Sequence, residues 1–456
     1  MVVRLGTASI AQGASVREPQ SVVAEGVQTR QRALSALLAV HRGELGSQAA
    51  VSAALHGVVG LDRGLLTELV YAALRRQRAL DRWIARACDR GLVGMAQPVL
   101  VALRLGALQL ADMPRIPAFA AVDATVQACK GTPGHNQGSV GFVHAVLRTL
   151  SRRVLAGDLP DRDDLPPWIA ARIVQLGRAV AVDPVALQHA FCQAAPLHLQ
   201  VLGSGQQLAE RAASLQDQGV LGPALPVPGA YVAAGPAVLG HPLFGVTFLA
   251  MDAASAAVVR WLDPQPGWRV LDLCAGRGVK SAVIAGCGAH VTAVDVSVAK
   301  LAQARALAMA AGTPLQETLA ADATGDLAVD HHSFDAVLVD APCTGLGTLR
   351  RRPEIRHRRR AADLTGLGHL QGQLADRAVQ WLRPGGVIML ATCSFAEEEG
   401  PLWLAGVRQR HPQLQRSPGN TLWIQEFLDS AGCLRTLPTQ FGGDAFFAAR
   451  LSDRTD

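Results

Sequence analysis

The stretch FDAVLVDAPCTGLG, from Phe334 to Gly347, joins an apolar strand to a turn that carries reactive side chains. A nearly continuous run of aliphatic residues is typical of a parallel strand that is covered on both faces of its sheet. The run ends at Asp340, and Cys343 follows three residues later. A second stretch, MLATCSFAEEE (389–399), repeats this order with Cys393. Each stretch therefore predicts a strand whose carboxyl end presents a thiol.

Two further apolar runs, WRVLDL (268–273) and HVTAVDV (290–296), come earlier in the chain, and each is followed by a helical segment. The repeated order of strand, turn and helix predicts an open, Rossmann-like α/β sheet. We assign this α/β domain to residues 246–456.

The first part of the chain has a different pattern. Apolar residues at helical spacing, such as Leu34, Leu37 and Leu38, predict an all-helical domain. We place this domain at residues 28–155, after a loose tail over residues 1–27, and expect a linker and a small α+β connector over residues 156–245.

The composition excludes several classes of protein. Hydrophobic residues make up 49% of the 456 residues, which is enough for two to four ordinary domains. No uncharged apolar run reaches the roughly 18 residues that a membrane span needs. The eight cysteines form no C-x-x-C pair of the kind that indicates structural zinc. We therefore expect a cytoplasmic protein with reduced thiols, no metal and no membrane association, and a monomer is the default expectation.

The charge balance permits a nucleic-acid partner without requiring one, since the formal net charge is +6. Among the 43 basic residues, only Lys130, Lys280 and Lys300 are lysines. A lysine that stands inside a motif is therefore more informative here than in an ordinary sequence.

In sheets of this kind, ligands bind beyond the carboxyl ends of the strands. The turn DLCAGRGVKS (272–281) contains Gly276 and Gly278, which let the backbone approach a ligand next to a helix N-terminus. Asp295 follows Asp272 by 23 residues, where a ribose-binding acid is expected. Because the third glycine of the dinucleotide motif is missing, a cofactor with a ribose but no pyrophosphate fits better. S-adenosylmethionine is the natural candidate, and another Rossmann-fold ligand is the alternative.

Most cysteines in proteins behave as small buried hydrophobes. Cys343 and Cys393 differ because each follows the end of a predicted strand by three residues or fewer. If the two strands are neighbours, both thiols face one pocket. Two thiols, an aspartate and a methyl donor suggest methylation at a pyrimidine carbon. Addition of a thiolate at C6 of cytosine makes C5 nucleophilic, and an acidic group near N3 would stabilise the developing charge. The cysteines for which a buried structural place is expected are Cys88, Cys129, Cys192, Cys287 and Cys433.

The motifs DLCAGRGVK, DAPCTGLG and ATCSFAEEE together resemble the RsmB/Sun family of 16S rRNA (cytosine-5) methyltransferases. The segments RIPAFAAVDATVQACK (115–130) and GSVGFVHAVLRTLSRR (138–153) resemble the NusB-like RNA-binding domain fused to its bacterial members. TLPTQFGGDAFFAAR (436–450) resembles the closing hairpin of the family, so that the resemblance covers roughly residues 28–450. It implies a class I methyltransferase domain, S-adenosylmethionine as cofactor and 16S rRNA as partner.

The resemblance also implies roles for individual residues. Cys393 corresponds to the nucleophile that attacks C6, and Cys343 to the second cysteine, which assists release of the product. Asp340 corresponds to the aspartate that contacts the base and orients the cofactor. Spacing alone leaves open which cysteine attacks. The other residues implied to bind S-adenosylmethionine, including an acid at the ribose and one beside the adenine, are Cys274, Ala275, Gly276, Arg277, Gly278, Val279, Lys280, Asp295 and Asp322.

The sequence departs from the family at the cofactor loop, which usually reads C-A-A-P-G-G-K. Arg277 replaces the proline and Val279 a glycine, while Lys280 is retained. Gly400 and His144 stand where asparagines are usual. Two alternatives therefore stay open. One is the same chemistry on another rRNA site or on tRNA, and the other is a non-catalytic RNA-binding ribosome-assembly factor.

A dense basic segment, RRRPEIRHRRR (350–360), follows the Cys343 motif directly. A charged stretch is usually a solvated helix start, but arginine forks suit phosphates and this one lies next to the predicted pocket. We predict phosphate contacts for its seven arginines, which are Arg350, Arg351, Arg352, Arg356, Arg358, Arg359 and Arg360.

Overall fold

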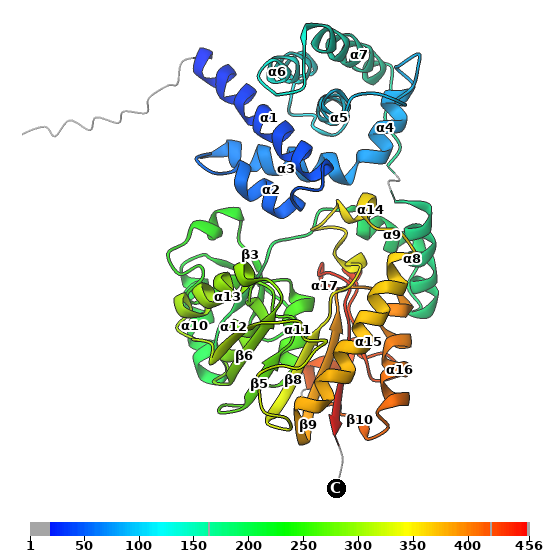
Figure 1. Cartoon of the computed structure of the whole chain (residues 1–456). Coiled ribbons are helices and arrows are strands. Elements are labelled where there is room, and N and C mark those ends of the chain that lie inside the picture. Colours follow the sequence, from blue (N-terminus) through cyan, green and yellow to red (C-terminus); the bar gives the residue numbers. More distant parts are fainter. Residues whose placement is uncertain (1–18, 163–164, 420–421, 454–456) are drawn as a thin grey trace, which may run out of the picture. The chain divides into compact units, whose positions relative to one another are not determined.

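The computed structural model describes residues 19–162, 165–419 and 422–453 (Figure 1). The chain divides into two compact units, residues 1–164 and residues 165–456. Helix α1 begins at Pro19, so it includes the part of the predicted tail from residue 19 to residue 27. Proline is tolerated in the first turn of a helix, and the segment after it contains no other helix breaker than one glycine. The rest of the predicted tail lies outside the described residues.

The first unit is all-helical over its described residues, as the sequence predicts. Leu34, Leu37 and Leu38 are buried in its single core. The last helix starts with a capping box, in which the side chains of Asn136 and Ser139 each accept from the other's backbone N–H. The helices are α1 (Pro19–His41), α2 (Ser47–Ala54), α3 (Leu61–Arg75), α4 (Gln77–Ala85), α5 (Gln97–Asp112), α6 (Ala118–Lys130) and α7 (Gln137–Leu155).

The second unit opens with two helices and a small antiparallel sheet. The sheet has four strands in the order β2-β3-β1-β4, and it gives the predicted α+β connector its strands. The division of this unit into a connector and a methyltransferase domain at residue 245 stays a prediction. The elements of this part are α8 (Pro167–Ala179), α9 (Pro184–Cys192), β1 (His198–Val201), α10 (Gly205–Asp217), β2 (Leu221–Ala224), β3 (Ala230–Ala233), η1 (Pro236–Gly240) and β4 (Phe248–Ala250).

The larger sheet has eight strands, with the order β10-β12-β9-β8-β5-β6-β7 and with β11 paired to β12. Strands β7, β6, β5, β8 and β9 are mutually parallel, whereas β12 runs antiparallel to β9. The predicted α/β sheet is confirmed, and it is mixed because the closing strands reverse direction. The strands are β5 (Arg269–Asp272), β6 (His290–Asp295), β7 (Glu317–Ala320), β8 (Phe334–Asp340), β9 (Leu382–Thr392), β10 (Leu414–Arg416), β11 (Leu434–Arg435) and β12 (Phe447–Asp453).

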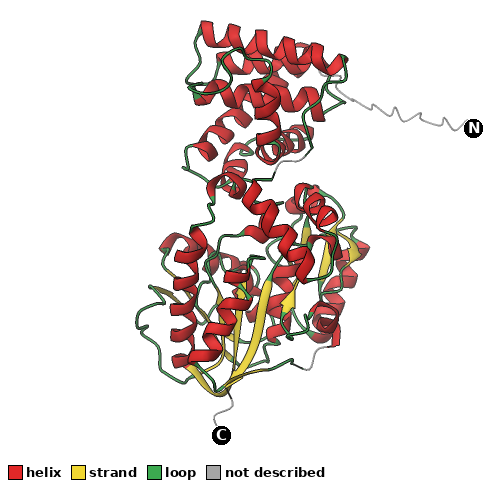
Figure 2. Cartoon of the chain, turned by 90° about the vertical axis from the view of Figure 1, so that its right-hand side faces the viewer, coloured by secondary structure: helices red, strands yellow, loops and turns green. Residues whose placement is uncertain are grey.

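Helices cover both faces of this sheet, and Figure 2 shows the strands of the second unit between them. Strand β8 explains the arrangement, because successive side chains of a strand point to opposite faces. Leu338 packs into one core with α11 and α12, and Val337 and Val339 pack into the other with α15 and α16. The remaining elements are α11 (Ala253–Leu262), α12 (Val279–Ala285), α13 (Val298–Ala310), η2 (Leu346–Thr348), α14 (Ile355–Arg358), α15 (Asp363–Trp381), η3 (Glu397–Glu399), α16 (Pro401–Arg410), η4 (Leu422–Phe427) and α17 (Pro438–Phe441).

Strands β7, β10 and β11 of the large sheet were not predicted from the sequence. Strand β7 lies at the edge of the sheet, and its residues 317–320 are exposed or half-buried. An edge strand pairs on one side only and needs no continuous apolar run, so ETLA gives no strong strand signal.

Candidate active site

The carboxyl ends of the parallel strands bring the predicted residues to one edge of the sheet. Asp272 ends β5, Asp295 ends β6 and Asp340 ends β8. In the register between β8 and β9, Asp340 lies opposite Ala391, so the segments after both strands leave the sheet side by side. The sequence analysis predicts that both thiols face one pocket if the two strands are neighbours. The register shows that the strands are neighbours.

The two thiols meet at this point. Sγ of Cys343 lies 3.2 Å from Sγ of Cys393, within hydrogen-bond distance for sulfur, and both side chains are half-buried. The hydrogen bond with Cys393 and burial raise the pKa of Cys343 well above its usual value. Cys343 is therefore held as a neutral thiol that can donate a hydrogen bond or a proton.

Gly347 fixes the two loops to each other. Its N–H donates to the carbonyl of Cys393 at 3.0 Å, and its own carbonyl accepts from the N–H of Ala445 at 3.1 Å. A Cβ atom at position 347 would lie 1.7 Å from the carbonyl oxygen of Ala445. Only glycine allows this approach, so the glycine of the Cys343 motif packs the loop between the Cys393 strand and the closing strand.

A charged pair lies beside the thiols. Nζ of Lys280 is 2.7 Å from Oδ2 of Asp340 and 5.6 Å from the ring centroid of Phe446. Burial opposes the charge of Lys280, but the carboxylate of Asp340 and its hydrogen bond outweigh this effect and raise the pKa of the lysine. The lysine of the cofactor loop thus remains a cation next to the aspartate of the Cys343 motif.

The cofactor loop has the backbone that the turn requires. Gly278 has a φ of +75°, and a Cβ atom there would lie 2.4 Å from Cβ of Ala304 on α13. Gly276 has a φ of +57°, and its N–H donates to Oδ2 of Asp295 at 3.0 Å. Of the two departures from the family loop, Arg277 is exposed and Val279 is the first residue of α12. Neither side chain disturbs the turn.

Three acids at or just after the carboxyl ends of β5, β6 and β7 are in different states. Asp272 is fully buried, which raises its pKa to about 6, and Oδ2 accepts from the hydroxyl of Ser281 at 2.6 Å. Oδ1 of Asp272 has no hydrogen-bond partner among the described residues. Asp295 accepts through Oδ1 from the N–H of Ser297. Asp322 is exposed, and hydrogen bonds from the backbone N–H and the hydroxyl of Thr324 lower its pKa.

These residues fit S-adenosylmethionine. A buried acceptor on Asp272 suits the positively charged methionine end, Asp295 suits ribose hydroxyls, and the backbone of the glycine turn allows close approach. Cys274 stands in the same loop, but burial and the nearby carboxylates of Asp272 and Asp340 raise its pKa. A thiol in that state is unreactive and contributes packing.

The arginines of residues 350–360 fall into two groups. Arg350 donates to the carbonyls of Gly442 and Ala194, and Arg356 donates to the carbonyl of Phe191; both side chains are buried. Arg351 lies between two buried carboxylates, Asp252 and Asp444. These three guanidinium groups join the segment to other parts of the same unit.

The remaining four arginines are more accessible. Arg359 is half-buried and donates to the carbonyls of Thr344 and Cys343, so it holds the cysteine loop. Arg352, Arg358 and Arg360 are exposed. The sequence predicts the same role for all seven arginines, whereas the structure buries some of them and exposes others. The reason is that burial depends on packing partners that are distant in sequence.

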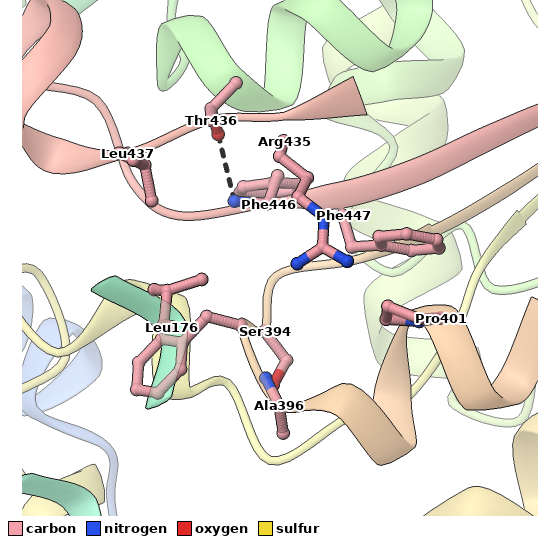
Figure 3. A pocket seen from close by; sticks show the side chains of 10 residues that line it. Leu176, Ser394, Ala396, Pro401, Arg435, Thr436, Leu437, Phe446 and Phe447 are labelled. Carbon is pink, nitrogen blue, oxygen red and sulfur yellow. Dashed lines mark hydrogen bonds between the residues drawn. The ribbon is translucent and has the colours of Figure 1, made fainter. Parts of the chain in front are cut away.

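A small pocket lies next to the Cys393 motif, and Figure 3 shows its lining. Ser394 and Ala396 contribute one wall, and Arg435 and Phe446 belong to the opposite hairpin. Neither thiol lines this pocket. It is thus separate from the cysteine pair, which lies at the edge of the sheet.

Sequence reasoning missed Glu399, Thr344 and Gln371. Glu399 is fully buried and accepts hydrogen bonds from the other two side chains. It stands at the end of an acidic run, and no local pattern distinguishes it from Glu397 and Glu398. Only its contacts with residues far away in sequence reveal that it belongs to the site.

No helix within the described residues is both long enough and apolar enough to cross a membrane. The same part of the chain contains no group of three or more His, Cys, Asp or Glu side chains that could hold a metal ion.

An open α/β sheet, a glycine turn with acids after two strands, and paired thiols define a class I methyltransferase. Comparison with known proteins gives the family. Residues 259–452 match the family of 16S rRNA methyltransferases RsmB/F, and residues 27–152 match the NusB family. The chain is 32% identical over 438 residues to the ribosomal RNA small subunit methyltransferase B of Xanthomonas campestris, with 94% of this chain and 98% of that protein covered.

Two other comparisons agree. A Mycobacterium tuberculosis protein that is named provisionally as a methyltransferase is 34% identical over 436 residues, with 87% of this chain and 90% of that protein covered. The crystal structure of PH0851 has the same fold, with a TM-score of 0.76 at 20% identity, and covers 92% of this chain and 98% of its own. The chain belongs to the RsmB/F family of 16S rRNA methyltransferases. It is an S-adenosylmethionine-dependent rRNA methyltransferase.

Proposed function

We propose that this protein methylates C5 of a cytosine in 16S rRNA, through a covalent adduct between Cys393 and C6 of the base. The observation that carries the proposal is the 3.2 Å separation of the Cys343 and Cys393 sulfur atoms at the ends of adjacent parallel strands. Small-subunit methyltransferases B from Xanthomonas campestris and Xylella fastidiosa, each about a third identical to this chain, support the substrate.

The roles of the two cysteines follow the resemblance to the family. Cys393, in the Thr-Cys-Ser motif, corresponds to the nucleophile, and Cys343 to the cysteine that takes part after methylation. The contact between the thiols is compatible with this division, because the hydrogen bond with Cys393 and burial raise the pKa of Cys343 and favour its neutral form.

The covalent chemistry begins and ends at Cys393. Its Sγ forms a bond to C6, the electron pair of the C5–C6 double bond moves to C4–C5, and the C4–N3 pair moves onto N3, which takes up a proton. The resemblance to the family assigns the contact with the base to Asp340. C5 then takes up a methyl group. A base removes the proton from C5, the double bond re-forms, and the C6–S bond breaks to return the thiolate. S-adenosylmethionine, when bound, supplies the electrophilic methyl group.

Lys280 and the glycine turn serve the cofactor side of the reaction. The ion pair between Lys280 and Asp340 fixes the carboxylate that faces the base. Asp272, Asp295 and the backbone from Cys274 to Lys280 hold the cofactor, and Asp322 stands beyond the next strand for the adenine.

RNA binding has an electrostatic part. Arg352, Arg358 and Arg360 are exposed just after the Cys343 loop and suit phosphate groups. The target cytosine has to leave its stack to reach Cys393, which costs a few kcal/mol, about the energy that a few phosphate contacts return.

The test uses Cys343→Ala protein with S-adenosylmethionine and protein-free small-subunit rRNA, analysed on a denaturing gel. Without the release cysteine, a covalent protein–RNA adduct should accumulate. The adduct should disappear in the double variant Cys343→Ala/Cys393→Ala. A matched control is Cys88→Ala, because Cys88 is half-buried in the first unit and takes no part in the site.

Mapping the adduct names the modified nucleotide and separates the 16S rRNA assignment from another rRNA site or tRNA. Absence of an adduct, together with no methyl transfer by the unmodified protein to any RNA fraction, would contradict the proposal. In that case a non-catalytic assembly factor would be the better description.

A further inference from the structure

Glu399 is the centre of a buried hydrogen-bond network that contacts both cysteine loops. Its side chain is fully buried, and among the described residues no cation forms an ion pair with it. Oε1 accepts from the backbone N–H of Thr344 at 2.7 Å and from the amide of Gln371 at 3.2 Å. Oε2 accepts from the hydroxyl of Thr344. Both carboxyl oxygens are therefore hydrogen-bonded, and the donors belong to the Cys343 loop and to Gln371.

The network holds the residues on both sides of Cys343. Thr344, which follows the cysteine, is held by Glu399 through its N–H and its hydroxyl. Pro342, which precedes it, accepts at its carbonyl from the Gln371 amide at 2.9 Å. The same Gln371 amide also donates to Glu399. The loop is therefore fixed immediately before and immediately after the thiol.

The network also reaches both neighbours of Cys393. The backbone carbonyl of Glu399 accepts from the hydroxyl of Thr392 at 2.9 Å. The hydroxyl of Ser394 lies 3.4 Å from that of Thr344. Glu399 thus contacts, through its side chain and its backbone carbonyl, the segments at both strand ends from which the thiols project.

We propose that Glu399 is a positioning residue that holds Cys343 against Cys393 and thereby sets the rate at which the methylated cytosine is released. The inference rests on the proposed function. Glu399 touches neither the base nor the cofactor in this scheme and acts only through Cys343. A displacement of the thiol by about 1 Å is enough to slow the step that needs it by a large factor.

The experiment compares the first turnover with steady-state turnover in Glu399→Gln, a variant that keeps the size of the side chain and removes its charge. Steady-state turnover should fall about tenfold or more, whereas methyl transfer in the first turnover should change by less than about twofold. A protein–RNA adduct should accumulate on a denaturing gel. Glu397→Gln is the matched control, because the same chemical change occurs at an exposed position two residues away.

A second comparison tests whether Glu399 acts through Cys343. Adding Glu399→Gln to Cys343→Ala should leave the amount of trapped adduct and the first-turnover rate unchanged. Further slowing in that background would overturn the inference. So would a parallel fall of first-turnover and steady-state rates in Glu399→Gln, accompanied by a lower unfolding temperature, because this pattern is that of a structural residue.

Thr344 provides an independent variant if Glu399→Gln folds poorly. Thr344→Val removes the hydroxyl that donates to Glu399 and should also trap the adduct, whereas Thr344→Ser retains the hydroxyl and should restore release. Equal release by both variants would overturn the inference. If Cys343→Ala alone forms no adduct and the unmodified protein transfers no methyl group, the proposed function fails independently of Glu399.

Discussion

Nζ of Lys280 lies 2.7 Å from Oδ2 of Asp340, so that the end of the cofactor loop and the end of strand β8 share one ion pair. The first residue comes from the methyl-donor motif and the second from the cysteine motif. In the function proposed above, this pair couples the two halves of the reaction, and Asp340 serves both the base and the cofactor side.

Replacement of Lys280 by methionine should lower methyl transfer about 100-fold, a size typical for loss of one charged group at a reacting centre. The change leaves the Asp340 carboxylate without its cation, while the methionine fills much of the same volume. Methyl transfer to small-subunit rRNA measures the effect. Lys130→Met, at an exposed lysine of the first unit, is the control. An unchanged rate in Lys280→Met would show that the ion pair does not serve the chemistry.

Gly278→Ala should destabilise the second unit and impair binding of S-adenosylmethionine. The left-handed backbone alone costs about 1–2 kcal/mol for alanine, and the 2.4 Å approach of the new Cβ to Ala304 adds a steric cost. Gly312→Ala provides the matched control, since its φ is +67° and a Cβ atom added there would meet no other atom within 4 Å.

The free energy of unfolding of each variant is measured with denaturant. The difference between the two values gives the steric cost at position 278. We expect Gly278→Ala to lose about 1–3 kcal/mol more than Gly312→Ala, which is the usual range for overpacking. Equal losses would mean that α13 moves away freely.

Asp272→Asn should change the pH dependence of stability. Burial raises the pKa of Asp272 in the folded protein to about 6, above its value in the unfolded chain. The folded state then binds the proton more tightly than the unfolded chain does. The stability gained in this way is fully present below about pH 4 and is lost as the pH rises through 6. Asparagine does not ionise and avoids the loss.

The stability of Asp272→Asn relative to the unmodified protein should therefore rise between pH 4 and pH 7, by up to about 3 kcal/mol. Urea unfolding across this range measures it. A difference that stays constant with pH would contradict the raised pKa.

Substitutions of Arg350 and Arg360 should distinguish an arginine that stabilises the fold from one that binds RNA. Arg350→Gln removes donors to the carbonyls of Ala194 and Gly442 and should cost about 1–3 kcal/mol of stability. Arg360→Gln, at an exposed position, should leave stability unchanged. It should weaken rRNA binding. It should also lower the slope of the logarithm of the binding constant against the logarithm of the salt concentration by about one, which corresponds to one phosphate contact. Binding measured over a range of salt concentrations distinguishes them. Equal salt slopes for Arg360→Gln and the unmodified protein would remove Arg360 from the interface.

The sequence alone determined the type of fold and the edge of the sheet at which the candidate site lies. Apolar runs of strand length that end in Asp340 and Thr392 indicate parallel buried strands, because only such strands need aliphatic residues on both faces. Their ends then share one edge for topological reasons. The placement of Cys343 and Cys393 after those ends followed without any contact information.

Only the tertiary structure decided which side chains work together across that edge. The burial of Glu399 in contrast to Glu397, and of Arg350 in contrast to Arg360, depends on neighbours up to about 150 positions away in the chain. Local sequence carries the period of a helix or strand, and charge runs look alike wherever they occur. Desolvation and hydrogen-bond partners, which set the state of each charge, arise only when distant segments pack together.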